Sequence, residues 1–206
     1  MSAALQRPVP PLLLASASAT RRALLEGAAL RFEARAAAVD EAAIKESAKA
    51  EGIPPEDAAV LLADAKAARI GRRETEALVI GADQLLVCED EWFDKPPDPA
   101  AARAQLRRLA GRTHTLVTAV VCWRHGARIW QHVATPRLTV RDFSDEFLDA
   151  YLAVEGERVT ASVGAYRLEG PGIHLFSRIE GEHSAILGLP LSPLLGFLRD
   201  HGVLLR

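Results

Sequence analysis

The first half of the chain alternates short apolar runs with helix-like segments. Two apolar runs, residues 12–15 and 78–82, are typical of buried strands. A short helix is expected from Thr20 to Gly27, directly after the first run, and a longer one at residues 55–69. The predicted apolar stripe of the longer helix consists of Ala58, Leu61, Leu62 and Ala65. Strands that alternate with helices favour a parallel sheet.

The second half has the pattern of antiparallel strands. Residues 116–123 and 128–140 flank the turn Arg124-His125-Gly126 and are predicted to form a long hairpin. Two further short strands are expected at residues 164–168 and 173–176, and residues 89–97 are expected to be irregular. The whole chain, residues 1–206, is therefore predicted to form a single α/β domain with a mixed, partly parallel sheet and flanking helices.

Helix caps mark three more helices in this half. Asp98 is a candidate cap with Pro99 at the first helical position, and Ser144 is a candidate cap for a helix ending near residue 154. The last helix is expected to have Ser192 as its cap and Pro193 at its first position.

Composition and charge narrow the classes of ligand. The 206 residues are 49% hydrophobic and 25% charged, which is ordinary for a soluble globular enzyme. A formal net charge of −2 argues against a nucleic-acid partner, because no positive field would attract the strand. A small anionic ligand is still compatible with a few local cations.

Nothing in the sequence indicates a membrane protein or a disulfide framework. Cys88 and Cys122 lie far apart and are interpreted as reduced thiols. No apolar segment has the length of a membrane span, and the proline-rich start does not resemble a signal peptide. We therefore expect a cytoplasmic protein without a membrane partner.

Phosphate chemistry is suggested by the polar turn after the first strand. Ser16, Ser18 and Arg21 occupy a strand-to-helix turn of small residues. Backbone N–H groups at a helix N-terminus can bind an anion, and an arginine can clamp a phosphate with two hydrogen bonds. The alternative interpretation is a serine-capped surface helix with solvated arginines.

Acidic and basic side chains near the predicted strand ends are the other candidates. Asp83 follows a buried run and is predicted to lie at the carboxyl end of its strand, where it could hold a divalent metal, act as a base, or cap a loop. If the two buried strands are parallel, Asp83 and the Ser16 turn face the same edge. Lys66, Lys95 and His114 could each reach a phosphate, although an exposed lysine or a structural histidine hydrogen bond is the simpler interpretation.

From about residue 12 to residue 200 the chain contains, in this order, the stretches LLLASASATRRALL, AAAVDE, LADAKA, VIGADQ, DKP, LAGRTH, YLAVEGE, VGAYRLEG and IEGEHSAILGLPL. This ordered set of motifs resembles the Maf family of nucleotide pyrophosphatases, also called septum formation inhibitors. The resemblance implies two lobes around an anion-binding cleft. It also implies dependence on Mg²⁺, Mn²⁺ or Co²⁺, and hydrolysis of a nucleoside triphosphate to a monophosphate and pyrophosphate, with the removal of non-standard nucleotides as a candidate role.

The resemblance also implies roles for individual residues. Ser16, Ser18 and Arg21, with Lys66 and Lys95, match the phosphate-binding positions. Glu41 and Asp83 match the catalytic carboxylates and are the candidate metal ligands; the sequence does not divide the roles of base and ligand between them. Two departures are noted: Ser18-Ala19-Thr20-Arg21 lacks the family's usual proline, and Ser162-Val163-Gly164 replaces a frequent Lys-Ala-Gly.

Three positions that track the choice of base in the family are Thr20, Gln84 and Glu169 here. Gln84 and Glu169 match members that act on 7-methyl-GTP, whereas Thr20 matches neither that subgroup nor the one that acts on thymidine and uridine triphosphates. A carboxylate offers only hydrogen-bond acceptors, which suits the N–H donors of guanine. The resemblance therefore points towards the 7-methyl-GTP subgroup.

Two alternatives to this activity are a nucleotide-binding regulator of septum formation with little turnover, and a general phosphomonoesterase. The regulator would not need both Glu41 and Asp83, and the phosphomonoesterase would release orthophosphate. Trp123 and Trp130 of the predicted hairpin could serve a homodimer or cover the core.

Overall fold

The structure is a computed structural model that describes residues 5–206. The chain divides into two compact units, and strands β3 (Leu78–Cys88) and β5 (Thr113–Arg124) contribute residues to both. The first unit comprises Met1–Gln84, Thr118–Ala134 and His183–Arg206, and the second comprises Leu85–Val117 and Thr135–Glu182.

Within residues 5–206, eight strands pair in the order β2-β1-β3-β5-β7-β8, with β4 beside β3 and β6 beside β5. β1 runs parallel to β2 and to β3, whereas the pairs β3–β4, β5–β6, β5–β7 and β7–β8 are antiparallel. The predicted α/β class with a mixed, partly parallel sheet is confirmed. The remaining strands are β1 (Leu12–Leu14), β2 (Glu33–Ala34), β4 (Glu91–Phe93), β6 (Ala127–Ala134), β7 (Arg137–Val140) and β8 (Phe176–Glu180).

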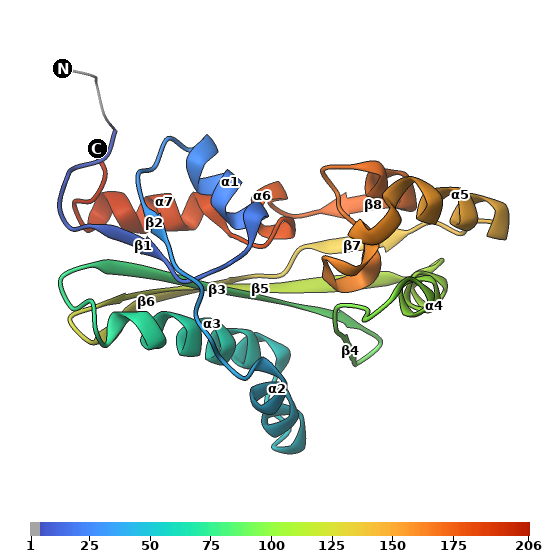
Figure 1. The fold of residues 1–206 in the computed structure, drawn as a ribbon, viewed down its shortest axis with the longest axis horizontal. Helices are drawn as coiled ribbons and strands as arrows, with labels where there is room; N and C mark the ends of the chain where they lie inside the picture. Colours follow the sequence, from blue (N-terminus) through green and yellow to red (C-terminus); the bar gives the residue numbers. More distant parts are fainter. Residues whose placement is uncertain (1–4) are drawn as a thin grey trace. The chain divides into compact units, whose positions relative to one another are not determined.

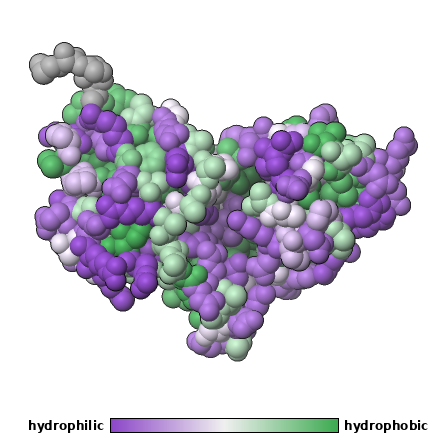
Figure 2. All heavy atoms as spheres, in the orientation of Figure 1, coloured by the Kyte–Doolittle hydropathy of each residue, from purple (hydrophilic) through white to green (hydrophobic). Residues whose placement is uncertain are grey.

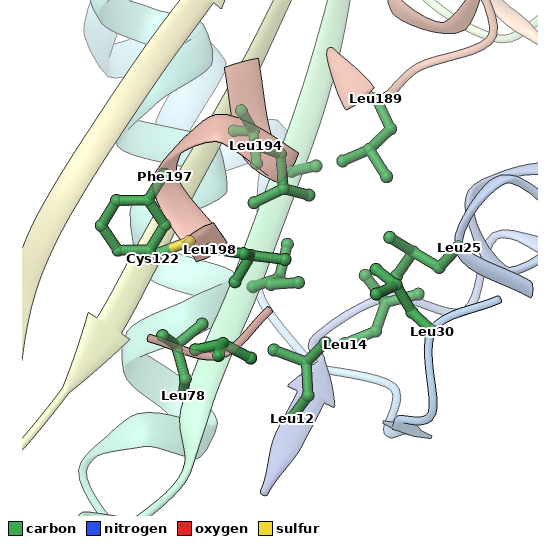
Figure 3. Close-up of a cluster of buried hydrophobic side chains, with 14 of the residues drawn as sticks. Leu12, Leu14, Leu25, Leu30, Leu78, Cys122, Leu189, Leu194, Phe197 and Leu198 are labelled. Carbon is green, nitrogen blue, oxygen red and sulfur yellow. The ribbon is translucent and has the colours of Figure 1, made fainter. Parts of the chain in front are cut away.

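Helices cover both faces of the strands in the first unit (Figure 1). Helices α1 (Ala19–Gly27) and α7 (Leu191–Asp200) lie on one face, and α3 (Pro55–Gly71) lies on the other. Two further helices of this unit are α2 (Glu41–Ala50) and α6 (His183–Ile186). The α1 and α7 side is filled by leucines: Leu12 and Leu14 of β1 pack in one buried cluster with Leu25 of α1 and Leu198 of α7 (Figure 3).

Close packing brings α3 onto β3. A Cβ atom on Gly81 of β3 would lie 2.3 Å from the carbonyl oxygen of Ala63, so only glycine permits this approach. Part of the predicted stripe of α3 is wrong, because Leu61 is 43% exposed. The buried face includes Ala58 and Leu62 of that stripe, together with Ala63 and Lys66.

The second unit contains α4 (Pro99–Leu109), α5 (Asp145–Glu155) and three short 3₁₀ helices, Gly156–Thr160, Val163–Ala165 and Pro171–Leu175. The predicted caps Asp98 and Ser144 are confirmed. Asp98 Oδ1 accepts a hydrogen bond from the Ala101 N–H at 2.8 Å, and Ser144 Oγ accepts one from the Phe147 N–H at 3.2 Å.

Several predicted boundaries are wrong for local reasons. The predicted strand at 128–140 is two strands, β6 and β7, separated at Thr135 and Pro136, where the proline cannot donate a backbone hydrogen bond. The predicted strand at 164–168 is the end of a short 3₁₀ helix followed by a turn, because Gly164 adopts φ +79° and turns the chain. The predicted strand at 173–176 is the end of the 3₁₀ helix Pro171–Leu175, and β8 begins only at Phe176. The last helix begins at Leu191 with Pro190 at the cap position, so Ser192 is not its cap and Pro193 is its third residue. Helix α2 and strand β4 were not predicted.

Among residues 5–206 no helix is both long and apolar enough to cross a membrane. Hydrophilic residues cover most of the surface visible in Figure 2. Cys88 and Cys122 are buried free thiols, as expected. Trp123 is 7% exposed and Trp130 stacks on Phe197 at 4.8 Å between ring centroids, so both tryptophans cover the core of the first unit.

Candidate active site

The turn from β1 into α1 is built by its two serines. Ser16 is buried, and its Oγ accepts a hydrogen bond from the Ser18 N–H at 3.2 Å. Ser18 is the N-cap of α1, and its Oγ accepts a hydrogen bond from the Arg21 N–H at 3.3 Å. The predicted strand, turn and helix are confirmed. The turn presents a helix N-terminus, whose unpaired N–H groups and dipole favour an anion.

Arg21 is held in a fixed direction by a distant part of the chain. Its Nε donates to the carbonyl oxygen of Gly188 at 2.7 Å, and its Nη1 donates to Ser16 Oγ at 3.4 Å. Gly188 has φ +98°, and a Cβ atom there would lie 3.4 Å from Arg21 Nε. Gly188 therefore belongs to the site, although the sequence marked it only as part of the IEGEHSAILGLPL stretch.

Lys66 joins the two candidate carboxylates. Its Nζ lies 2.5 Å from Asp83 Oδ1 and 2.8 Å from Glu41 Oε1. Lys66 is 8% exposed and Asp83 is 5% exposed, whereas the Glu41 side chain is 44% exposed. Lys66 is thus neither a surface lysine nor a snorkelling one. It is a buried cation whose charge is matched by two acids from different elements, as buried charges require.

The fold explains how three distant residues meet. Asp83 lies inside β3 and not at its end, which corrects the prediction. Strand β1 nevertheless stops early, and its last paired residue, Leu14, lies opposite Ile80, so Asp83 is beyond the end of β1. Glu41 is the first residue of α2, where Asp40 caps the helix by accepting from the Ala43 N–H at 3.0 Å.

The charges in this group influence one another. Burial lowers the pKa of Arg21, while the charges of Asp83 and Glu41 act in the opposite direction, and an arginine stays protonated in either case. Burial raises the pKa of Glu41, but hydrogen bonding and charge from Lys66, with smaller effects of Lys45 and Arg21, lower it overall. We call Arg21, Lys66, Glu41 and Asp83 the charge cluster; its formal charge is zero.

Two of the predicted specificity residues lie near the charge cluster in sequence. Thr20 is half-buried in the first turn of α1. Gln84 follows Asp83, and its Nε2 approaches three acceptors: Thr118 Oγ1 at 2.8 Å and the carbonyl oxygens of Ala185 and Ile186 at 3.0 and 3.1 Å. The amide of Gln84 thus ties β3 to α6, a contact that the sequence did not reveal.

The other predicted site residues belong to the second unit. Lys95 is exposed in the segment between β4 and α4, and Glu169 is exposed in a turn that the Gly170 N–H closes on the Arg167 carbonyl at 3.1 Å. Arg167 is fixed by Glu155, with Nε–Oε2 and Nη2–Oε1 distances of 3.0 and 3.1 Å. The hydrogen bond from Arg167 to the buried Glu155 raises the pKa of Arg167.

His114 has a structural environment. It is 1% exposed, and its Nε2 lies 2.8 Å from the hydroxyl of Tyr166. Burial lowers the pKa of His114 to about 4, so the ring is neutral at pH 7. The simpler interpretation of this residue, a structural hydrogen bond, agrees with the structure.

Comparison with known proteins addresses the family directly. A family model described as "Maf-like protein" matches residues 11–201. The chain belongs to the Maf family. It is 57% identical over 193 residues to a protein of Granulibacter bethesdensis named nucleoside triphosphate pyrophosphatase, covering 94% of this chain and 98% of the relative. A Rhodospirillum rubrum protein of the same name is 53% identical, covering 96% and 98%.

A Maf relative with a different name is also close. A Rhizobium meliloti protein named 7-methyl-GTP pyrophosphatase is 50% identical over 195 residues, covering 95% of this chain and 98% of the relative.

The charge cluster can be tested for its fit to a divalent ion. Mg²⁺ is usually held by one or two carboxylates together with substrate phosphates and water. Glu41 and Asp83 supply two carboxylates around one point, and residues 5–206 contain no group of three or more His, Cys, Asp or Glu side chains suited to a metal. The donor set fits an ion that is shared with a triphosphate.

Proposed function

We propose that this Maf protein hydrolyses nucleoside triphosphates to a nucleoside monophosphate and pyrophosphate. The observation that carries the proposal is the buried Lys66 between Asp83 and Glu41, in the same unit as the Ser16–Arg21 turn. Oxygen ligands for an ion and cations for phosphates are the two requirements of phosphoryl chemistry. Relatives named nucleoside triphosphate pyrophosphatase at 53–57% identity support the same activity.

In the proposed mechanism, the chain's own residues position the triphosphate and accept a proton. Arg21 and Lys66, with Lys95 as a further candidate, bind the phosphate oxygens. A water oxygen forms a bond to the α-phosphorus as the α–β bridging P–O bond breaks, and pyrophosphate leaves with the electron pair. The water's proton passes to Asp83 or Glu41. A divalent ion held by Glu41 and Asp83 would neutralise phosphate charge and acidify the attacking water.

We further propose a guanine-type triphosphate, either GTP or its 7-methylated form, as the preferred substrate. Gln84 and Glu169 match the 7-methyl-GTP subgroup, and a relative with that name is 50% identical. Glu169 is exposed and can accept hydrogen bonds from the N–H groups of guanine. The amide nitrogen of Gln84 already donates to Thr118 and to a carbonyl of α6. Gln84 would therefore influence the choice of base through these contacts and not by donating this N–H to the base.

The test is an assay that measures pyrophosphate and orthophosphate separately over 7-methyl-GTP, GTP, UTP and dTTP. We expect pyrophosphate from every substrate that is turned over, and the highest kcat/KM for the two guanine nucleotides. Orthophosphate as the first product would indicate a phosphomonoesterase. Tight nucleotide binding without turnover would indicate the regulatory alternative. A clear preference for UTP and dTTP would contradict the base assignment alone.

A further inference from the structure

Lys66 stands where a divalent ion would need to bind. Its Nζ contacts one oxygen of Asp83 and one of Glu41, the two carboxylates that fit such an ion. The ammonium is buried and cannot swing into solvent without leaving both acids. Gly81 keeps α3 tight against β3, so the stem of Lys66 stays beside Asp83. The ammonium and a metal ion would therefore compete for the same two carboxylates.

Charge accounting gives the direction of this competition. The positive charges of Arg21 and Lys66 balance the negative charges of Glu41 and Asp83, so the charge cluster has no net charge. A bare divalent ion would bring two positive charges within a few ångströms of a buried ammonium, and repulsion is strong where water is excluded. A triphosphate brings about four negative charges and gives Lys66 and Arg21 new oxygen partners.

We propose that Lys66 is an internal counter-ion that keeps Glu41 and Asp83 from binding a divalent ion until a triphosphate arrives. On arrival, Lys66 exchanges its carboxylate partners for phosphate oxygens, and the carboxylates exchange the ammonium for the ion. Glu41 changes partner more readily, because its side chain is 44% exposed while Asp83 is buried. The ion and the nucleotide therefore bind together, and each strengthens the binding of the other.

The inference rests on the proposed function only in that a divalent ion and a triphosphate share the site. Its test measures binding and not turnover. Mn²⁺ binding to the full-length protein is followed by the loss of the free-ion electron paramagnetic resonance signal, with and without an α,β-methylene triphosphate analogue that cannot be cleaved at that bond. The Mn²⁺ that the analogue binds in protein-free solution is measured separately and subtracted. For the native protein we expect Mn²⁺ to bind at least tenfold more tightly in the presence of the analogue.

Substitution of Lys66 isolates its contribution. Lys66→Met keeps a long apolar stem and removes the charge, so Mn²⁺ alone should bind at least tenfold more tightly than to the native protein. Lys66→Arg keeps the charge and should leave the weak binding of Mn²⁺ alone unchanged. The matched control is Arg69→Met, which removes one positive charge from the exposed face of the same helix and should have little effect.

Two results would overturn the inference: equal Mn²⁺ affinity of the native protein with and without the analogue, or no gain in Lys66→Met beyond that in Arg69→Met. If Lys66→Met does not fold, Lys66→Gln and the native comparison still decide the matter. Pyrophosphate release by a native protein that binds Mn²⁺ tightly by itself would refute the counter-ion role and leave the proposed function intact.

Discussion

Two groups of buried charges, one in each unit, use similar side chains in opposite proportions. In the charge cluster of the first unit, one ammonium, that of Lys66, is shared by two carboxylates. In the second unit, one carboxylate, Glu155, is shared by Arg167 and Arg158. The Glu155 side chain is only 1% exposed, and the Arg167 guanidinium uses both of its oxygens.

The two groups differ in the ratio of acids to bases and in hydrogen-bond geometry, and these differences distinguish a candidate catalytic site from a structural ion pair. The ammonium of a lysine is a point charge that can move from one oxygen to another, and that of Lys66 contacts two carboxylates. The guanidinium of Arg167 is a rigid fork, and its two parallel hydrogen bonds to Glu155 hold the turn that carries Glu169. We infer that the charge cluster serves chemistry and that the Glu155–Arg167 pair serves architecture.

The largest expected effect is on the charge cluster. Removal of divalent ions by excess chelator should reduce pyrophosphate release to background, and addition of Mg²⁺ or Mn²⁺ should restore it. The unfolding temperature should stay nearly the same, because Lys66 neutralises the charges of Asp83 and Glu41 when no divalent ion is bound. Both are measured on the same samples. Full activity in excess chelator would rule out the divalent-ion mechanism.

The next effect is that of Asp83→Asn. The change keeps the volume and removes the charge, so kcat should fall by at least tenfold, and by about 10²–10⁴ if Asp83 is the base. The free energy of unfolding should change by less than about 1 kcal/mol, because Lys66 keeps Glu41 as a partner.

Steady-state kinetics and urea unfolding are the measurements for Asp83→Asn. A variant that retains more than about a tenth of the native activity loses less than about 1.4 kcal/mol of transition-state stabilisation, and Asp83 would then not be catalytic.

Glu155→Ala should show the opposite behaviour. Loss of a buried partner leaves Arg167 uncompensated, which costs about 3–5 kcal/mol when both groups are buried. Because Arg167 is 27% exposed and can regain water, we expect a loss of about 2–3 kcal/mol in urea unfolding. The kcat of the folded variant should stay within a few fold of the native value. Glu157→Ala, at an exposed neighbour, is the control. Equal stability of the two variants would show that the Glu155–Arg167 pair does not stabilise the second unit.

The smallest expected effect concerns the base. Glu169→Gln should shift the kcat/KM ratio of GTP to UTP towards UTP by about 3–10-fold, because one charged hydrogen-bond acceptor is worth about 1 kcal/mol. Glu157→Gln removes the same charge elsewhere in the second unit and should leave the ratio unchanged. An unchanged ratio in Glu169→Gln would mean that this residue only closes the turn before Gly170.

Local chemistry explains which predictions from the sequence were right. Helix caps are local: the side chains of Ser18, Asp98 and Ser144 each accept a hydrogen bond from the N–H three residues later. Such caps can therefore be predicted from a few adjacent residues. Predictions failed where the backbone is decided by distant partners. The strand β3 continues past Asp83 because β4 and β5 pair with it. The segment around Gly164, which has φ +79°, packs so closely on β3 that a Cβ atom there would lie 2.6 Å from Leu86 Cδ1.

The sequence by itself determined the alternation of strands and helices, the serine-capped turn from Ser16 to Arg21 and the identity of the charged candidates. Only the tertiary structure decided that Lys66 joins Asp83 to Glu41, that the carbonyl of Gly188 aims Arg21, and that Gln84 is tied to α6. These contacts span 17 to 167 residues along the chain. A short segment of the sequence is enough to predict the period of the hydrophobic positions and the helix caps. A buried charge finds its partner only after close packing, here permitted by Gly81, has brought the elements together.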